Sequence, residues 1–375
     1  MNSLNLAENI VRLRREKKIT QEQLAEVIGV TKASVSKWET KQSMPDVLLL
    51  PQLATFFGVT IDALLGYEPQ LCKEQIQKQY YELTKAFAEE DFETVMERSR
   101  MLVKQYYSCY EFLLQIAVLW LNHYMLPGEA QGRAVLKEAK ELCDHVQQNC
   151  KEIRICNDAI ALKAALALQL GEAAEVVELL EEISDPCRLG MQNDATLIGA
   201  YMLSGERKKA DEFNQISTYI HLQALMGGAL QELLIHSGEL ERCEETMRRV
   251  MQVVQAYRLE DINANSVILL HYRMAMVYLL HGKKGSAISE LQAFVQLTQE
   301  MLKTELVALR SDDYFTEFGV WLERLTLGGG APRDKRIIYD SMIKGLEDPV
   351  FEVLKEEKTY QKLLENARCF KRIYQ

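Results

Sequence analysis

The sequence lacks the features that define several large classes of protein. Only seven of its 375 residues are proline, and no apolar run approaches the roughly 20 residues of a membrane span. Its eight cysteines include no CxxC pair, and the tightest group, Cys143, Cys150 and Cys156, fits no zinc spacing, so we interpret the cysteines as small apolar residues. The segment from Met1 to Leu6 has neither the basic start nor the apolar run of a secretion signal. We therefore expect a cytoplasmic protein without a disulfide framework.

Residue patterns of catalytic and cofactor sites are also missing. Five of the six histidines fall in predicted helices and have no partner at ligand spacing: His123, His221, His236, His271 and His281. There is no glycine-rich nucleotide loop, HExxH motif or calcium-loop pattern. We expect neither an enzyme nor a bound metal or cofactor.

Near its start the sequence has the pattern of two short helices joined by a turn. Residues 20–31 predict a short helix, a glycine turn at Gly29 and the start of a second helix, with Thr20 and Thr31 as N-caps. Residues at helical spacing predict inner faces formed by Leu24, Val27 and Ile28 in the first helix and by Val35 and Trp38 in the second. Two helices joined in this way can lay the second one in the major groove of DNA.

The motifs around these helices extend over residues 9–66. They are Ile10-Val11-Arg12-Leu13-Arg14, Thr20-Gln21-x-x-Leu24-Ala25, Gly29-Val30-Thr31-x-x-Ser34-Val35-Ser36-x-Trp38-Glu39, Pro45, and Leu53-Ala54-x-Phe56-Phe57-Gly58-Val59-Thr60-Ile61-Asp62-x-Leu64-Leu65. This segment, about one sixth of the chain, resembles the Xre/Cro/CI family of helix-turn-helix regulators. The resemblance implies a five-helix, lambda-repressor-like domain that binds double-stranded DNA.

Helical geometry assigns roles within the second helix. Successive residues advance by about 100°, so Val35, Trp38 and Glu39 cluster with the cap on one side. The residues predicted to face the groove and read bases are Lys32, Ala33, Ser36 and Lys37. Lysine can donate to guanine O6 and N7, and an alanine methyl suits a thymine methyl.

The core side also holds Glu39, whose carboxylate needs a partner there. The family resemblance supplies Arg14 as that partner. Gln21 opens its helix, so its side chain and backbone N–H can both reach a phosphate. With the candidates that the resemblance adds, the predicted DNA-backbone contacts are Arg14, Thr20, Gln21, Thr31, Ser34, Thr40, Lys41 and Gln42. The sequence Thr40-Lys41-Gln42 departs from the Asn-Gly or Arg-Gly ending that is commoner in the family.

Charge is distributed unevenly along the chain. The formal net charge is −10, yet residues 1–66 contain eight Lys or Arg against seven Asp or Glu. That segment is therefore +1, and the remainder carries −11. The acidity of the remainder either discourages non-specific contact with nucleic acid or simply keeps the protein soluble.

From about Lys73 the pattern is almost entirely helical. Four glycines, each followed five residues later by a small or medium residue, space the helices at 34, 33 and 44 residues: Gly171 with Val176, Gly205 with Ala210, Gly238 with Cys243, and Gly282 with Ala287. A period near 34 is the tetratricopeptide signature. Helical pairs at roughly 73–106 and 109–149 should extend the same superhelix.

The predicted organisation is thus all-α, with a tetratricopeptide-like α-superhelix after the DNA-binding domain. Residues 1–66 form the helix-turn-helix domain, which Gly66 and Pro69 close. Residues 67–72 form a linker, and residues 73–327 form the repeat domain. Residues 328–375 form C-terminal helices after the break at Gly328-Gly329-Gly330, which we interpret as a linker or hinge because no Gly-Lys-Ser/Thr follows.

This architecture resembles the peptide-responsive quorum-sensing regulators of Gram-positive bacteria. The resemblance implies a homodimeric, sequence-specific DNA-binding transcriptional regulator whose helical domain senses a peptide or protein partner. The alternative is an interaction scaffold with a DNA-binding head and no small ligand. Counting back from the repeat glycines, the predicted groove-lining positions are Asp158, Gln169, Gln192, Glu232, His236 and Tyr272.

Overall fold

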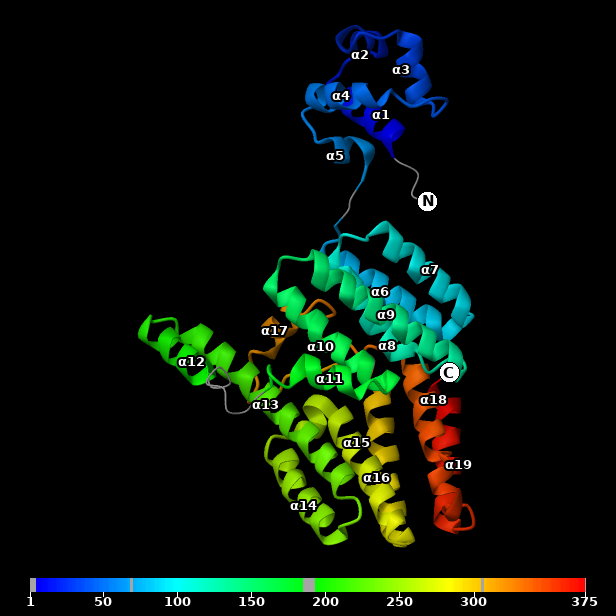
Figure 1. Cartoon of the computed structure of the whole chain (residues 1–375), viewed down its shortest axis with the longest axis vertical. Helices are drawn as coiled ribbons and strands as arrows, with labels where there is room; N and C mark the ends of the chain where they lie inside the picture. The colour runs from blue at the N-terminus through cyan, green and yellow to red at the C-terminus, as the bar shows by residue number, and fades with distance from the viewer. Residues whose placement is uncertain (1–4, 68–69, 185–192, 305–306, 375) are drawn as a thin grey trace. The chain divides into compact units, whose positions relative to one another are not determined.

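A computed structural model describes residues 5–67, 70–184, 193–304 and 307–374, with side chains up to residue 370. The fold class is all-α, as predicted. Within the described ranges the regular elements are helices, and Ala308 and Gly330 form an isolated antiparallel bridge. The chain divides into two compact units, one comprising residues 1–72 with 102–109, the other residues 73–101 and 110–375 (Figure 1).

The N-terminal unit contains the predicted five helices. They are α1 (Leu6–Glu16), α2 (Gln21–Ile28), α3 (Lys32–Glu39), α4 (Leu50–Phe57) and α5 (Ile61–Leu65), with a short 3-10 turn, η1 (Val47–Leu49), before α4. Thr20 caps α2 through a capping box with Gln23, and Thr31 caps α3. Gly29 adopts the left-handed conformation, φ 76°, that ends α2 and allows the tight turn into α3.

The small core of this unit is built from one apolar face of each helix. Its buried members include Ile10, Leu13, Leu24, Ala25, Ile28, Val35, Trp38, Leu53, Phe57 and Leu64. The prediction for Val27 is wrong, because its side chain is 58% exposed. Ala25 occupies the inner face instead. In a helix of eight residues, the apolar pattern alone did not distinguish these two positions.

The second unit, together with residues 102–105 of the first, is a succession of helices. They are α6 (Lys73–Glu89), α7 (Phe92–Gln105), α8 (Tyr110–His123), α9 (Glu129–Asn149), α10 (Ile153–Leu170), α11 (Ala173–Leu180), α12 (Asn193–Leu203), α13 (Arg207–Ile235), α14 (Leu240–Ala256), α15 (Leu259–Leu280), α16 (Lys284–Lys303), α17 (Phe318–Arg324), α18 (Lys335–Leu346), η3 (Pro349–Leu354) and α19 (Lys358–Tyr374). From α8 to α11 and from α12 to α16 neighbouring helices pack on each other, and α10 also packs on α8, as α15 does on α13. Contacts of this kind are typical of stacked helical hairpins.

The four repeat glycines all lie between helices. Gly171, Gly205 and Gly282 have positive φ, and Ala210, Cys243 and Ala287 are buried, whereas Val176 is only half-buried. A helix-turn-helix unit would need a second turn between Gly205 and Gly238, but α13 spans this interval as one helix of 29 residues. The spacing of 33 residues therefore marks the two ends of a single long helix at this point.

The glycine-rich break is not a free hinge. The Tyr81 hydroxyl of α6 donates a 2.8 Å hydrogen bond to the Leu327 carbonyl, and the Tyr80 hydroxyl donates to the Pro332 carbonyl at 3.2 Å. A Cβ added to Gly330 would overlap the Tyr81 hydroxyl. After this segment α18 and α19 pack on α16. The residues interpreted as a hinge are thus packed against the helical unit.

Candidate DNA-binding surface

The exposed face of α3 carries the residues predicted to read bases. Lys32, Ala33 and Lys37 are exposed and Ser36 is half-buried. On the opposite face Val35 and Trp38 are buried against the other helices. The helix therefore presents a small polar face with two ammonium groups, while its apolar face holds it in the domain.

An ion pair fixes the C-terminal end of α3, where Glu39 lies. The Arg14 guanidinium donates from Nε to Glu39 Oε1 at 2.6 Å and from Nη2 to Oε2 at 3.0 Å. Its Nη1 donates to the Ile19 carbonyl at 2.8 Å. The Gln21 side-chain amide also donates to Glu39 Oε2, at 2.8 Å. A single carboxylate thus connects α1, the start of α2 and the end of α3.

This environment shifts both ionisable groups toward their charged forms. Burial alone would raise the pKa of Glu39, but the hydrogen bonds from Arg14 and Gln21 outweigh it and hold that pKa below its usual value. The hydrogen bond to Glu39 likewise raises the pKa of Arg14. The pair stays ionised at neutral pH.

The lysines of the surface differ in their partners. Lys32 lies 3.5 Å from Glu22, with both side chains largely exposed, and such a pair separates readily. Lys41, predicted to contact the DNA backbone, forms an ion pair with Glu8 of α1. In the described part of the chain no carboxylate lies within ion-pair distance of Lys37. Its ammonium group can therefore approach a base without first leaving a carboxylate.

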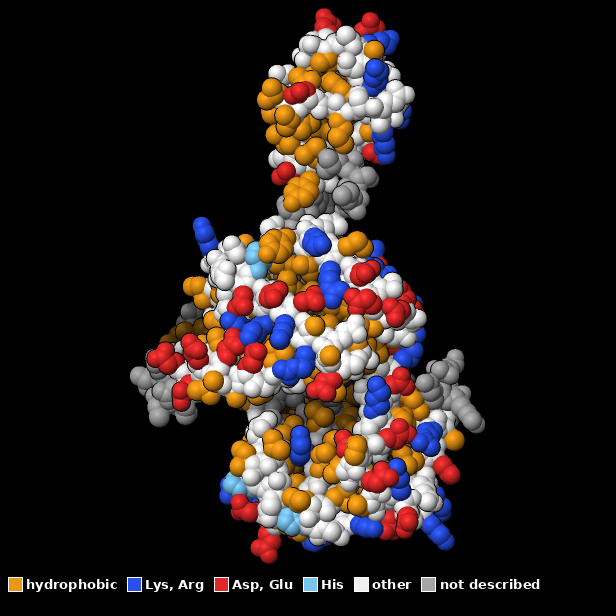
Figure 2. Space-filling view, turned by 45° about the vertical axis from the view of Figure 1, so that its right-hand side comes forward, with side chains coloured by type: hydrophobic (Ala, Val, Ile, Leu, Met, Phe, Trp, Pro, Cys, Tyr) orange, Lys and Arg blue, Asp and Glu red, His pale blue; other side chains and the backbone are white. Residues whose placement is uncertain are grey.

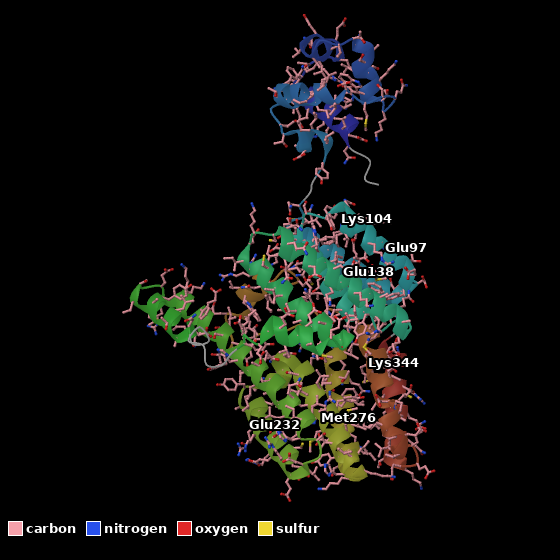
Figure 3. The ribbon with its side chains drawn as sticks, viewed as in Figure 1. Glu97, Lys104, Glu138, Glu232, Met276 and Lys344 are labelled. Carbon is pink, nitrogen blue, oxygen red and sulfur yellow. The ribbon has the colours of Figure 1, made fainter. Side chains whose placement is uncertain are left out.

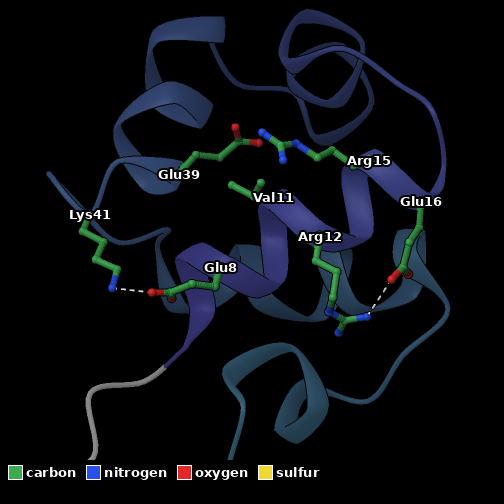
Figure 4. A pocket seen from close by; sticks show the side chains of 7 residues that line it. All are labelled: Glu8, Val11, Arg12, Arg15, Glu16, Glu39 and Lys41. Atoms are coloured by element: carbon green, nitrogen blue, oxygen red, sulfur yellow. Dashed lines mark hydrogen bonds and ion pairs between the residues drawn. The ribbon is translucent and has the colours of Figure 1, made fainter.

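A shallow pocket of about 450 Å³ lies between α1 and the end of α3 (Figure 4). Its charged walls are mixed: Glu8, Glu16 and Glu39 are acidic, and Arg12, Arg15 and Lys41 are basic. Arg12 also pairs with Glu16 at 2.9 Å. Sequence reasoning did not find this pocket, because the pairing of Glu8 with Lys41 joins residues far apart in the chain. Its opposing charges do not define a site for a ligand of one sign.

Several predicted backbone contacts are engaged within the domain. The Thr20 and Thr31 hydroxyls accept from the backbone N–H groups of Gln23 and Ser34. The Thr31 and Ser34 hydroxyls are 2.9 Å apart. The Thr40 hydroxyl donates to the Ser36 carbonyl at 2.9 Å.

Two further candidates are directed into the domain. The guanidinium of Arg14 faces Glu39 and Ile19, and the amide nitrogen of Gln21, expected at a phosphate, is bound to Glu39. Gln42 is exposed just beyond α3. A phosphate at the start of α2 would therefore meet the backbone N–H groups before it met the nitrogen of Gln21.

The residues predicted to line a ligand groove lie on several helices. Gln192 lies outside the described residues. Tyr272 is half-buried and contacts Phe294 and Phe351, and its hydroxyl donates to the Gly345 carbonyl at 3.2 Å. Asp158 is exposed on α10. The Tyr124 hydroxyl donates to the side-chain oxygen of Gln169 at 2.9 Å.

The remaining two candidates lie together at the end of α13. Glu232 pairs with Arg242 of α14 at 2.7 Å and lies 3.8 Å from His236; Figure 3 labels its position. Glu232 also lines a groove of about 270 Å³ between α13 and α14. The walls of this groove are mainly apolar, which the polar pattern used for the prediction did not reveal.

Comparison with known proteins assigns the N-terminal segment. Residues 10–64 match the family model described as helix-turn-helix. They form a helix-turn-helix domain. A stretch of 61 residues is 44% identical to the HTH-type transcriptional activator BcrR of Enterococcus faecalis, covering 16% of this chain and 30% of that protein. A stretch of 54 residues is 41% identical to the uncharacterized HTH-type transcriptional regulator YobD of Bacillus subtilis (strain 168), covering 14% of this chain and 48% of that protein.

The match with these relatives is confined to the helix-turn-helix domain. The chain spans less than half the length of each of the two relatives. No solved structure is significantly similar to the chain. The family assignment therefore concerns residues 10–64, and the helical unit rests on its own geometry.

No helix among the described residues combines the length and hydropathy needed to cross a bilayer. No group of three or more His, Cys, Asp or Glu side chains in the same ranges is arranged to hold a metal ion.

Proposed function

We propose that the chain is a sequence-specific DNA-binding transcriptional regulator. The observation that carries this proposal is the exposed face of α3, where Lys32, Ala33, Ser36 and Lys37 project from a helix-turn-helix domain. A helix of this kind fits the major groove, where two lysines can donate to guanine. The names of the two relatives, an activator and a regulator, support the same function. It requires access to DNA and hence the cytoplasmic location expected from the sequence.

Lys37 gives the sharpest test. The cognate site is first selected from a random duplex library with the full chain. Lys37→Ala should then lose about 1–3 kcal/mol, roughly five- to 150-fold in affinity, on that site and little on random DNA, since a base contact carries specificity. Lys78→Ala is the matched control, because Lys78 is an exposed lysine on α6. Equal losses on both duplexes would make Lys37 a phosphate contact.

We further propose that the helical unit dimerises and senses a peptide or protein partner. The support is the groove between α13 and α14, with Glu232 and its neighbour His236 at one end. Apolar walls with a polar rim suit a short linear segment with apolar side chains. On the face seen in Figure 2, acidic and basic side chains are interspersed over this unit, so charge alone does not select the partner.

A screen of the full chain against a peptide library tests the sensing role. Binding of a short peptide that weakens on Glu232→Ala, but not on Asp158→Ala, would support a site beside α13. Capture of a folded protein with no peptide bound would favour the interaction scaffold instead. A ligand whose binding ignores both substitutions would overturn the proposed location.

A further inference from the structure

Helix α13 has an exposed face without charge. From Phe213 to Gln231 the sequence contains no Asp, Glu, Lys or Arg. One side of the helix packs on α14 and α15 through buried residues that include Tyr219, Leu222, Met226 and Leu233. Helix α12 packs on its first half, where Asp194 contacts Ser217 and His221. The opposite side, an arc of about 120°, carries exposed residues, namely Ile220, Ala224, Gly227, Gly228, Gln231, Leu234 and Ile235. Ile220 and Leu234 are 50% exposed and Ile235 is 69% exposed.

At the centre of this face are two glycines that the fold of the single chain does not require. Gly227 and Gly228 have ordinary helical conformation, and a Cβ added to either would meet nothing within 4 Å. Glycine is a poor helix former, so two adjacent ones weaken a long helix. What they provide is a place where another backbone can approach closely.

Two isoleucines are placed symmetrically about these glycines. Ile220 lies seven residues before Gly227, and Ile235 lies seven residues after Gly228. Ala224 and Gln231 lie three residues before and after in the same way. An antiparallel copy of the helix crossing at the glycines would therefore place each Ile220 against Ile235 of the partner subunit. A two-fold axis requires this kind of self-complementary surface.

Charge also favours a second copy of the chain as the occupant of this face. Each chain has a net charge of −10, and two such molecules approach with least repulsion where their surfaces carry no charge. A partner of opposite charge would gain nothing from this face.

We propose that α13 is a self-association surface, on which two copies of the chain pair antiparallel and cross at Gly227 and Gly228. This inference rests on the dimerisation included in the proposed function, and it supplies the surface. The distance from Ile220 to Ile235 along one helix is about 22 Å, so these two side chains cannot meet within one chain.

The first test blocks the close approach of the two α13 helices at the glycines. Sedimentation of the full chain over a wide range of concentration should show a dimer. Gly227→Gln combined with Gly228→Gln should raise its Kd at least about tenfold, because the added side chains hold the helices apart, while the melting temperature does not fall, because glutamine is the better helix former. Gly285→Gln is the control: Gly285 is an exposed glycine of α16 with nothing within 4 Å of an added Cβ.

The second test pairs charges across the axis. Ile220→Glu and Ile235→Lys, made separately, should each weaken the dimer about tenfold, since each buries an unpaired charge. Combined in one chain, they should restore most of the affinity, because each new carboxylate then faces an ammonium of the partner subunit. Restoration would exclude a different protein as the natural occupant of this face.

Three results would overturn the proposal. They are a wild-type chain that stays monomeric at every concentration, a dimer that ignores the glutamine variants, and a double charge variant no stronger than the single ones. If the chain binds DNA specifically but the α13 substitutions leave its dimer unaffected, only the proposed self-association surface is overturned. An α13-dependent dimer without specific DNA binding would overturn the proposed transcriptional function alone.

Discussion

Removing the guanidinium of Arg14 should destabilise the helix-turn-helix domain strongly at neutral pH and weakly at pH 5. Arg14→Met keeps the aliphatic stem but removes both hydrogen bonds to Glu39, whose side chain is only 6% exposed. Breaking a buried pair costs about 3–5 kcal/mol. Because this pair lies close beneath the surface and Gln21 still donates to Glu39, we expect the lower end of that range.

Protonation of Glu39 limits the free-energy cost of Arg14→Met. With an unfolded pKa of 4.5, neutralising Glu39 at pH 7 costs about 3.4 kcal/mol, since each pH unit corresponds to 1.36 kcal/mol. The unpaired Ile19 carbonyl adds about 1 kcal/mol. At pH 5 the ceiling on the charge contribution falls to about 0.7 kcal/mol. In the wild type the lowered pKa of Glu39 stabilises the folded state above pH 4.5, and this stabilisation is lost as the pH falls below that value. The free energies of unfolding of the two proteins therefore converge as the pH falls.

Hydrogen-exchange mass spectrometry of the full chain in increasing urea measures this cost on peptides from residues 6–65. Arg12→Met is the matched control, because the side chains of Arg12 and its partner Glu16 are 55% and 57% exposed. That substitution should cost less than about 0.5 kcal/mol. The reasoning is refuted if Arg14→Met costs no more than the control, or if its cost is the same at pH 5 and pH 7.

Two further predictions concern the helical unit. Burial lowers the pKa of His123 from 6.5 to about 4, so stability present above pH 6.5 should be lost as the pH falls toward 4, by up to about 3 kcal/mol. His123→Phe, which can keep the ring contact with Phe87, should flatten this dependence in pH-dependent melting curves, and an unchanged curve would contradict the assignment. Gly330→Ala should cost about 1–3 kcal/mol through overlap with the Tyr81 hydroxyl, whereas Gly330→Ala in a Tyr81→Phe background should cost less in urea unfolding.

Local patterns were enough to predict the N-terminal domain. The caps at Thr20 and Thr31 and the turn at Gly29 depend on neighbouring residues, and so the sequence indicates them directly. The exposed face of α3 follows from helical periodicity. The contact of Gln21 could not be predicted in this way. Its amide donates to a carboxylate 18 residues away, and nothing in the adjacent sequence indicates that contact.

The helical unit was harder to predict because its details depend on distant packing. The glycine period suggested tetratricopeptide-like hairpins, but α13 continues as one helix through Gly227 and Gly228, which take helical conformation here. Tyr272 was assigned to a groove by its place in the repeat, and the structure adds contacts with Phe294 of α16 and Phe351 of η3. The sequence gives no local signal that these segments meet.

The carboxylate shared by three helices has a consequence for the thermodynamics of association with DNA. Because the side chains of Arg14 and Gln21 both hold Glu39, the orientation of α3 is settled during folding, and its conformational entropy is lost there and not in binding. Only exposed side chains such as Lys32 and Lys37 keep rotamer freedom until contact. The entropic penalty of recognition at α3 is therefore confined to these side chains, at about 1 kcal/mol for each one immobilised.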